Sequence, residues 1–237
     1  MSRTLLQMVQ EATNLLVIPT PNTVTGSSDP QILQLWKIAN EEGRKHSARY
    51  PWQALTNEAT FTTVATESQG AITTLAGAGY RSIVNDTIWN RSLKRPVFGP
   101  LSNSNWQQLK AQVFTGPWNQ YRIRGNNVIF TPVPPAGQTC AFEWISKNWA
   151  FSNSGTPQSS LLADDDQIYL DDEVFFQGLI WRWHKRKGFD YAEDFADYEK
   201  LIADAMAKDG GKPILTLNGS ADDYPPGIMV PIGSWNL

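Results

Sequence analysis

Side chains that commonly carry out catalysis or bind metals are scarce in this sequence. His46 and His184 are its only histidines, and neither has a second ligand at the spacing of HExxH, CxxC or His-x-His zinc sites. The phosphate-binding P-loop, the dinucleotide-binding GxGxxG loop and the GxSxG nucleophile turn are also absent. The sequence therefore predicts no metal ion, no cofactor and no catalytic residue, which means a protein that is not an enzyme.

Acidic residues are concentrated in one segment, DDDQIYLDDE, from Asp164 to Glu173. Paired carboxylates can hydrolyse glycosides, and clustered ones can bind calcium. This segment lacks the glycine and the spacing of a calcium loop, and solvated acids are common where a helix begins. A hydrolase that uses Asp164 to Glu173 remains an alternative hypothesis.

Basic residues are concentrated in a second segment, LIWRWHKRKGFDYAEDF, from Leu179 to Phe195. Cations in the last turns of a helix are stabilised by the helix dipole, and this is the first interpretation of the cluster. The second interpretation is a patch that faces DNA or a partner protein. Both concern the same four side chains, Arg182, Lys185, Arg186 and Lys187.

The ten tryptophans suggest another function, because indole rings stack on sugars. A Trp-rich glycan-binding module of a phage tail is therefore a further alternative. However, Trp36, Trp181 and Trp183 fall in helical segments predicted to be buried, which favours a role in the core or at an interface.

The overall charge limits the partners. The chain has 20 Lys and Arg against 23 Asp and Glu, a net charge of -3, so any contact with DNA should be local or weak. Cys140 is the only cysteine, and no secretory leader and no long apolar run is seen. We expect a protein made in a reducing cytoplasm that has no contact with membranes.

The elements that position these residues are helices near both ends and strands between them. Apolar periodicity predicts helices over residues 2–16, 29–50 and 172–187, the last of them buried and stopped by Gly188. Asp190 and Glu193 predict a capping box for a fourth helix, which should bury Tyr191, Phe195, Tyr198 and Ile202. Residues 152–166 are predicted to be a polar loop.

Short β-branched and alternating runs predict strands between residues 56 and 149. YRIRGNNVIF, with its Gly-Asn turn, is the clearest hairpin, and one short helix is expected over about 103–113. In the last of these strands, Cys140, Phe142 and Trp144 alternate with Ala141, Glu143 and Ile145, which fits a sheet with one packed face. Cys140 is therefore predicted to be a small side chain of the core. Together with the helices, these strands predict an α+β fold.

The last segment, residues 212–237, has too many prolines and glycines for a long helix but is too apolar for a plain disordered tail. It either folds back on its own chain or forms an extended arm that binds a partner. The arm interpretation assigns partner binding to six side chains, Tyr224, Ile228, Met229, Val230, Ile232 and Trp235.

The chain resembles the head-to-tail adaptor (connector) proteins of short-tailed bacteriophages. The resemblance extends over about residues 1–213 and rests on the order of seven blocks: LLQMVQEATNLL, QALTNEATFTTVA, NDTIWNRSLKRPVFGPLS, YRIRGNNVIFTPVPPAG, FEWISKNW, GLIWRWHKRKGFDYAEDFADYE and AKDGGKP. It implies a helical bundle formed by residues 1–55 and 151–211, a β-rich insertion over 56–150 with one short helix, and an extended arm over 212–237.

The same resemblance implies a structural virion protein at the head–tail junction. Such a protein forms a twelve-membered ring beneath the portal protein, contacts the tail nozzle or a tail fibre protein, and surrounds the channel through which DNA leaves. The family contributes no active-site residues. Because the chain is mildly acidic, with a net charge of -3, DNA is expected to pass through the ring without sequence-specific binding.

Overall fold

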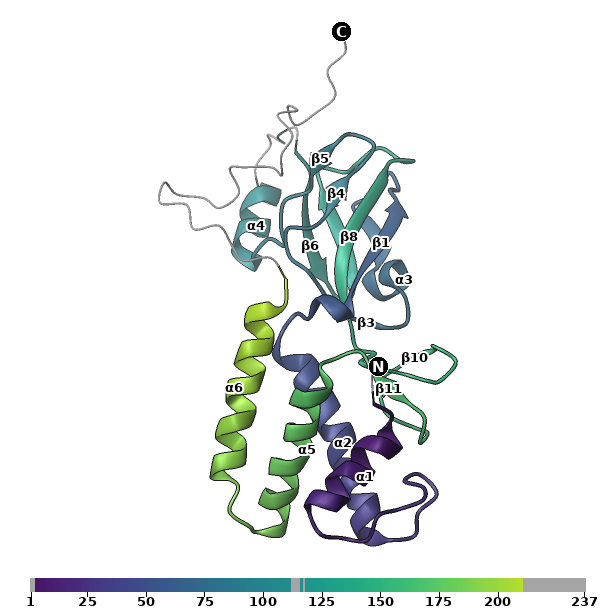
Figure 1. The fold of residues 1–237 in the computed structure, drawn as a ribbon. Coiled ribbons are helices and arrows are strands. Elements are labelled where there is room, and N and C mark those ends of the chain that lie inside the picture. Colours follow the sequence, from purple (N-terminus) through teal and green to yellow (C-terminus); the bar gives the residue numbers. More distant parts are fainter. Residues whose placement is uncertain (1–2, 112–115, 117, 211–237) are drawn as a thin grey trace. The chain divides into compact units, whose positions relative to one another are not determined.

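The computed structural model describes residues 3–111, 116 and 118–210, and Figure 1 shows that helices and antiparallel sheets are both present. The predicted α+β class is therefore confirmed. The described residues form two compact units. We call residues 3–55 with 147–210 the helical unit, and the described part of 56–146 the β unit.

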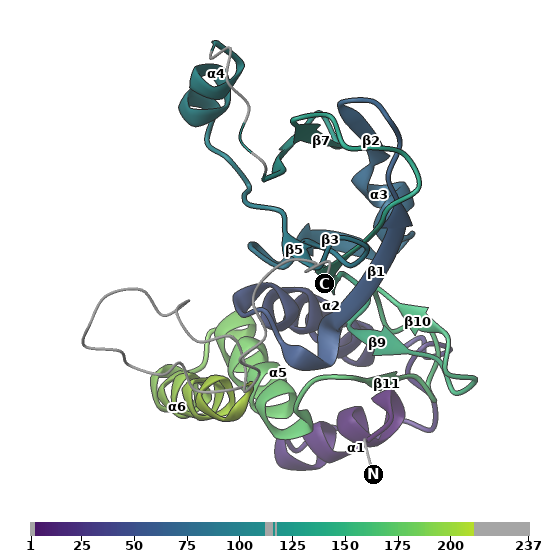
Figure 2. The ribbon, with the colours of Figure 1, turned by 90° about the horizontal axis from the view of Figure 1, so that it is seen from above.

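Four helices form most of the helical unit: α1 (Leu5–Leu15), α2 (Pro30–Arg49), α5 (Asp172–Lys187) and α6 (Ala192–Lys208). Their ends follow from local chemistry. Thr4 and Gln7 form a capping box before α1, Asp29 caps α2 with Pro30 at its first position, and Gly188 ends α5 in the left-handed conformation. α5 packs against α1, α2 and α6, as Figure 2 shows end-on.

The middle of α5 is buried, as predicted. Its apolar run fills the space between the neighbouring helices with Val174, Phe175, Phe176, Leu179, Ile180, Trp181 and Trp183. Trp149 packs beside α5, with its ring centroid 6.0 Å from that of Phe175. The middle of α5 therefore lies in a core rich in aromatic rings, and most of the charged residues of α5 lie in its first and last turns.

The prediction for α6 was wrong in two respects. The expected capping box is not formed, because Tyr191 is the N-cap and Asp190 accepts a hydrogen bond from the N–H of Ala192 instead. Tyr198 and Ile202 are buried, but Tyr191 and Phe195 stay 36% and 38% exposed. Among the helices of this unit, α6 packs mainly on α5, so only a narrow apolar stripe is covered.

A small three-stranded sheet surrounds the segment predicted as a polar loop, residues 152–166: one strand lies within that segment, and the other two lie just before and just after it. β9 (Ala150–Phe151) pairs antiparallel with both β10 (Pro157–Gln158) and β11 (Gln167–Ile168). Each strand has only two residues, which is too short for the alternation that marks strands in a sequence.

The β unit contains two sheets around one core. The first has the order β1 (Thr56–Thr62), β8 (Thr139–Ser146), β4 (Trp89–Asn90) and β5 (Arg95–Pro96), and β3 (Tyr80–Ile83) also pairs with β8. The second has the order β2 (Ser68–Ala71), β7 (Asn127–Thr131) and β6 (Gln120–Arg124). Both sheets contribute to a cluster that includes Phe61, Phe130 and Phe142.

Two sequence predictions are confirmed in the β unit. β6 and β7 form the predicted hairpin, and its turn residues Gly125 and Asn126 have φ values of 55° and 67°, as a two-residue turn of this type requires. Cys140 is fully buried, and burial raises the pKa of its thiol to about 12.

Two short helices lie in the β unit, α3 (Ile72–Ala76) and α4 (Asn103–Ala111), where one was predicted. α3 is only one turn and a half long, so its sequence gives no helical period to detect. Across the described residues of both units, none of the helices combines the length and apolar character needed to cross a bilayer.

Candidate interaction surfaces

The basic cluster of α5 is divided between two kinds of contact, and Arg182 and Arg186 make the first kind. Their guanidinium groups reach α2, where Arg182 is hydrogen bonded to Glu42 and Arg186 to Glu41. Glu41 also accepts a hydrogen bond from Lys45, and the bonds from Lys45 and Arg186 lower the pKa of its carboxyl. Both arginines of the cluster are therefore paired with acids of their own unit.

Lys185 and Lys187 make the second kind of contact. The Lys187 Nζ lies 4.4 Å from the centroid of the Trp183 ring. The Lys185 Nζ lies 5.7 Å and 5.4 Å from the ring centroids of Trp181 and Tyr191. These are cation–π distances. The cations that suggested a DNA-facing patch thus have partners within the helical unit, at the end of α5 where the helix dipole also favours them.

A buried acid holds the centre of this arrangement. Glu42 is completely buried, and its carboxylate accepts hydrogen bonds from Arg182 and from the Tyr198 hydroxyl, the latter at 2.8 Å. Burial raises the pKa of Glu42 and outweighs the opposing effect of Arg182 and Tyr198. Gly178 makes room for the carboxylate, because a Cβ at this position would lie 2.4 Å from the Glu42 Cδ.

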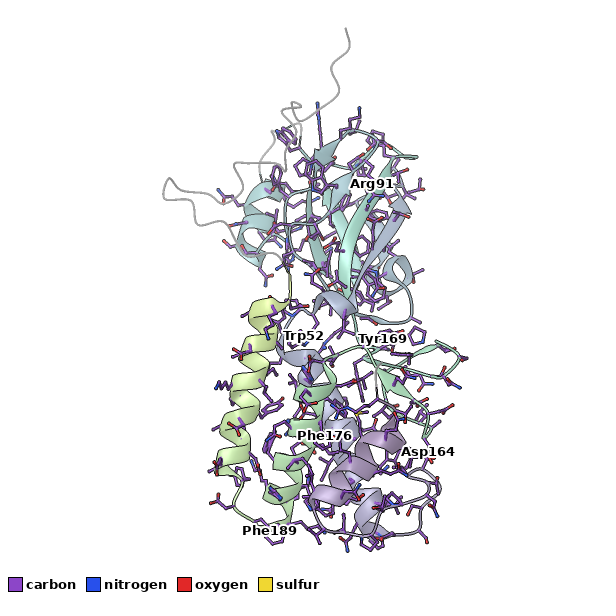
Figure 3. All side chains as sticks on the ribbon, viewed as in Figure 1. Trp52, Arg91, Asp164, Tyr169, Phe176 and Phe189 are labelled. Atoms are coloured by element: carbon purple, nitrogen blue, oxygen red, sulfur yellow. The ribbon has the colours of Figure 1, made fainter. Side chains whose placement is uncertain are left out.

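A hollow of about 400 Å³ lies beside this buried acid, between α2, α5 and α6. Its lining combines aromatic rings with ionised groups and includes Lys45, Arg49, Trp181, Phe195, Tyr198 and Glu199. In the lining of this hollow, Arg49 and Glu199 form a bidentate ion pair. The pair raises the pKa of Arg49 and lowers that of Glu199. The ring of Phe189, at the turn between α5 and α6 (Figure 3), is 61% exposed.

The acidic segment mostly fixes loops and a helix start. Asp164, labelled in Figure 3, accepts hydrogen bonds from the backbone N–H groups of Val24 and Thr25 and from the Thr23 and Thr25 hydroxyls, at 2.6–3.1 Å. Burial alone would raise the pKa of Asp164, but these hydrogen bonds outweigh that effect and lower the pKa. Asp171 caps α5 by accepting from the N–H groups of Glu173 and Val174.

Other acids of the segment are also engaged. The buried Asp166 accepts from the N–H groups of Leu162 and Ala163 at 2.6 Å and 2.9 Å. Arg3 donates from its backbone to Asp172 at 2.9 Å and from its side chain to Glu173 at 2.7 Å. A shallow hollow of about 660 Å³ is lined by these last groups. Their hydrogen bonds give the carboxylates a structural role in joining distant parts of the chain.

The two histidines lie in different environments. His46 is fully buried, its ring packs edge-on against Trp52 at 5.1 Å, and neither ring nitrogen has a hydrogen-bond partner among the described residues. Burial lowers the pKa of His46 to about 4. His184 is bonded through Nδ1 to the Asp194 carboxylate on α6. Across the described residues, no group of three or more His, Cys, Asp and Glu side chains is arranged to hold a metal ion.

The six residues assigned to the C-terminal arm, Tyr224, Ile228, Met229, Val230, Ile232 and Trp235, lie outside the described residues. Sequence reasoning also missed the buried network around Glu42. Its two hydrogen-bond partners, Arg182 and Tyr198, lie 140 and 156 positions away from it along the chain. The available signal was an acid at the helical spacing of buried Leu35 and Ile38, and it does not identify the partner.

Comparison with known proteins gives no assignment. No family model matches the chain, and no curated protein matches it.

Proposed function

We propose that the chain is a ring-forming adaptor of a short-tailed bacteriophage. It joins the capsid portal to the tail at the head–tail junction of the virion and surrounds the DNA exit channel. The observation that carries the proposal is the ordered series of sequence blocks, together with the chain order of the elements. Helices from both ends of the chain pack in one unit, and a β-rich segment is inserted between them.

In this proposal α1, α2, α5 and α6 are the helical bundle of the adaptor, and residues 212–237 are its arm. The arm binds a neighbouring protein through its apolar side chains. Burying each large side chain contributes about 1.5–3 kcal/mol before the cost of ordering the segment, so several together stabilise an attachment.

The charge pattern supports a conduit that does not grip DNA. The net charge is -3, and the densest cluster of cations has its partners within the helical unit. Binding to phosphates requires cations that are free to replace the counterions of DNA. We therefore propose that DNA passes through the ring without sequence-specific contact, and that binding by the free protein is weak and salt-sensitive.

Electron microscopy of the chain mixed with its portal protein tests the proposal. The expected result is a ring of twelve copies beneath the portal. A protein that neither forms rings nor attaches to the portal at any mixing ratio would contradict the adaptor function. Binding to a glycan array, in place of portal binding, would favour the glycan-binding module, and turnover lost on Asp165→Asn would favour a hydrolase.

A chain that ends at Lys212 tests the arm separately. The residues removed, 213–237, are proposed to bind a partner and not to stabilise the fold. The shortened chain should therefore keep its helical circular dichroism and its melting temperature but fail to co-sediment with the portal. The full chain with Trp235→Ala is the matched milder variant and should lose part of the binding. A large drop in the melting temperature of the shortened monomer would instead mean that residues 213–237 pack in the core of their own chain.

A further inference from the structure

The outer face of the first sheet of the β unit places two acids opposite each other. In the antiparallel pairing of β1 with β8, Glu58 is the direct partner of Glu143, and both are exposed. Side chains at such positions have their Cβ atoms about 4.5–5.5 Å apart, and like charges there are unfavourable. Arg91, labelled in Figure 3, pairs with Glu58 at 2.7 Å. Glu143 has no ion pair among the described residues.

An exposed indole lies beside these acids. Trp89 on β4 is the direct partner of Ala141 on β8, one alternate position along the strand from Glu143. Its ring is 41% exposed, although the chain buries most of its other large aromatic side chains in the described units. Because Ala141 is small, the surface beside the ring is hollowed. The hollow has a volume of about 430 Å³, which lies within the range of ligand-binding sites.

The residues around the hollow are fixed by hydrogen bonds to β8. The Thr87 hydroxyl donates to the carbonyl of Val84 at 2.7 Å and accepts from the N–H of Glu143 at 3.1 Å. The N–H of Arg91 donates to the carbonyl of Thr139 at 2.8 Å. The segment that carries Asp86, Trp89 and Arg91 is thus attached to the strand that carries Glu143. The hollow is therefore formed before a ligand arrives, which reduces the cost of binding.

The charge of the lining selects the ligand. The lining includes three acids, Glu58, Asp86 and Glu143, and one base, Arg91, so its formal charge is 1 - 3 = -2. The face of an indole ring also attracts cations. Among the described residues no group of three or more His, Cys, Asp and Glu side chains is arranged to hold a metal ion. An organic cation complements both the carboxylates and the ring face.

We propose that this hollow binds a basic segment of a partner protein, with an arginine or lysine side chain lying on Trp89 and paired with Glu143 and Asp86. The partner supplies the positive charge that the opposed glutamates lack. The inference does not depend on the adaptor function, because it rests only on contacts within the β unit.

Fluorescence anisotropy with the full chain tests this proposal. The probe is a fluorescein-labelled, end-capped Gly-Arg-Gly-Arg-Gly peptide, and the matched probe carries citrulline, which is neutral and similar in shape, in place of arginine. We expect saturable binding of the arginine peptide below about 1 mM. The citrulline peptide should bind about tenfold more weakly. Absence of binding, or equal binding of both peptides, would overturn the proposal.

Two variants locate the site. Glu143→Gln and Trp89→Leu should each weaken binding of the arginine peptide about fivefold or more. Glu193→Gln, which changes the net charge equally but lies on α6 of the helical unit, should leave binding within about twofold. Equal weakening by Glu193→Gln would show general attraction to an acidic protein and would overturn the site.

Thermal melting separates binding from a structural role. If Glu143 is kept for a ligand, Glu143→Gln relieves its repulsion with Glu58, so the melting temperature of the free protein should stay the same or rise. A clear fall would assign Glu143 to the stability of the sheet. Binding of neutral oligosaccharides, abolished by Trp89→Leu but unaffected by Glu143→Gln, would identify a glycan site instead.

Discussion

The helical unit provides internal partners for its densest cluster of cations, whereas the outer sheet face of the β unit leaves one of two opposed acids without an ion pair among the described residues. Between α2 and α5, Arg182 and Arg186 meet Glu42 and Glu41. On the β unit, Glu58 and Glu143 lie opposite each other and only one of them is paired with Arg91. The densest charge cluster in this sequence thus has partners within its own unit. The unbalanced acids beside the exposed Trp89 are the basis of the partner site that we propose.

The largest expected effect comes from breaking the buried pair of the helical unit. Arg182→Met leaves the Glu42 carboxylate buried without its cation, which should lower the free energy of unfolding by about 3–5 kcal/mol. Urea unfolding followed by helical circular dichroism measures the change. The double variant Glu42→Gln with Arg182→Met removes both charges and should lose less than the single one.

The matched change in the β unit is Arg91→Met, which breaks an ion pair whose two side chains are 52% and 53% exposed. Exposed pairs contribute about 0–1 kcal/mol, so this loss should be much smaller. Equal losses for Arg182→Met and Arg91→Met would remove the proposed contrast between the two units.

The second effect is a pH dependence that is confined to the helical unit. His46 has its pKa lowered to about 4 in the folded state from 6.5. The unfolded state therefore binds more protons below pH 6.5, so the stabilisation is present above that pH and is lost as the pH falls toward 4. Between pH 7 and pH 5 the loss should be about 2 kcal/mol.

Urea unfolding of the helical signal at both pH values measures this dependence. His46→Phe keeps a ring against Trp52 but cannot bind a proton, so it should remove most of the pH dependence. Lys200→Met on α6 is the control and should preserve it, because Lys200 is exposed and a lysine does not titrate between pH 5 and pH 7. A pH dependence that is the same in all three proteins would assign it to other groups. His184→Gln should leave ring assembly intact.

The third effect concerns the hairpin of the β unit. Gly125→Val places a β-branched side chain at a φ of 55°, which should cost about 1–2 kcal/mol. Gly125→Asn is the matched control, because asparagine tolerates this conformation better. The near-ultraviolet circular dichroism signal should therefore be lost at a lower temperature in Gly125→Val than in Gly125→Asn. Equal melting would mean that the turn relaxes without cost.

Much of this fold could be predicted because its signals are local. The caps Asp29 and Gly188 and the turn of Gly125 and Asn126 each act within a few residues, and their elements were placed correctly. The small sheet of β9, β10 and β11 was missed because two-residue strands have no period.

The candidate sites depend on contacts that sequence spacing does not show. Tyr198 meets Glu42, and Glu143 faces Glu58, across long stretches of chain. An isolated acid in a helix or strand gives no sign of which residue it will face. Exposure has the same limit, because Trp89 and the buried Trp144 both occur in strands with similar neighbours.

The smallest expected effect tests whether the remaining cations of α5 are held internally. Lys187→Met keeps the length of the side chain but removes its charge from the face of Trp183, 4.4 Å away. An exposed cation–π contact contributes about 0.5–1 kcal/mol, and the lost helix-dipole interaction adds a few tenths. Lys200→Met on α6 is the control, because Lys200 is exposed and lies before the last turn of its helix. Urea unfolding should therefore show a loss of about 0.5–1 kcal/mol for Lys187→Met and close to none for Lys200→Met. If Lys187→Met instead leaves stability unchanged and weakens binding to duplex DNA in a salt-dependent manner, this end of α5 faces DNA. Internal pairing of the basic cluster is then limited to Arg182 and Arg186.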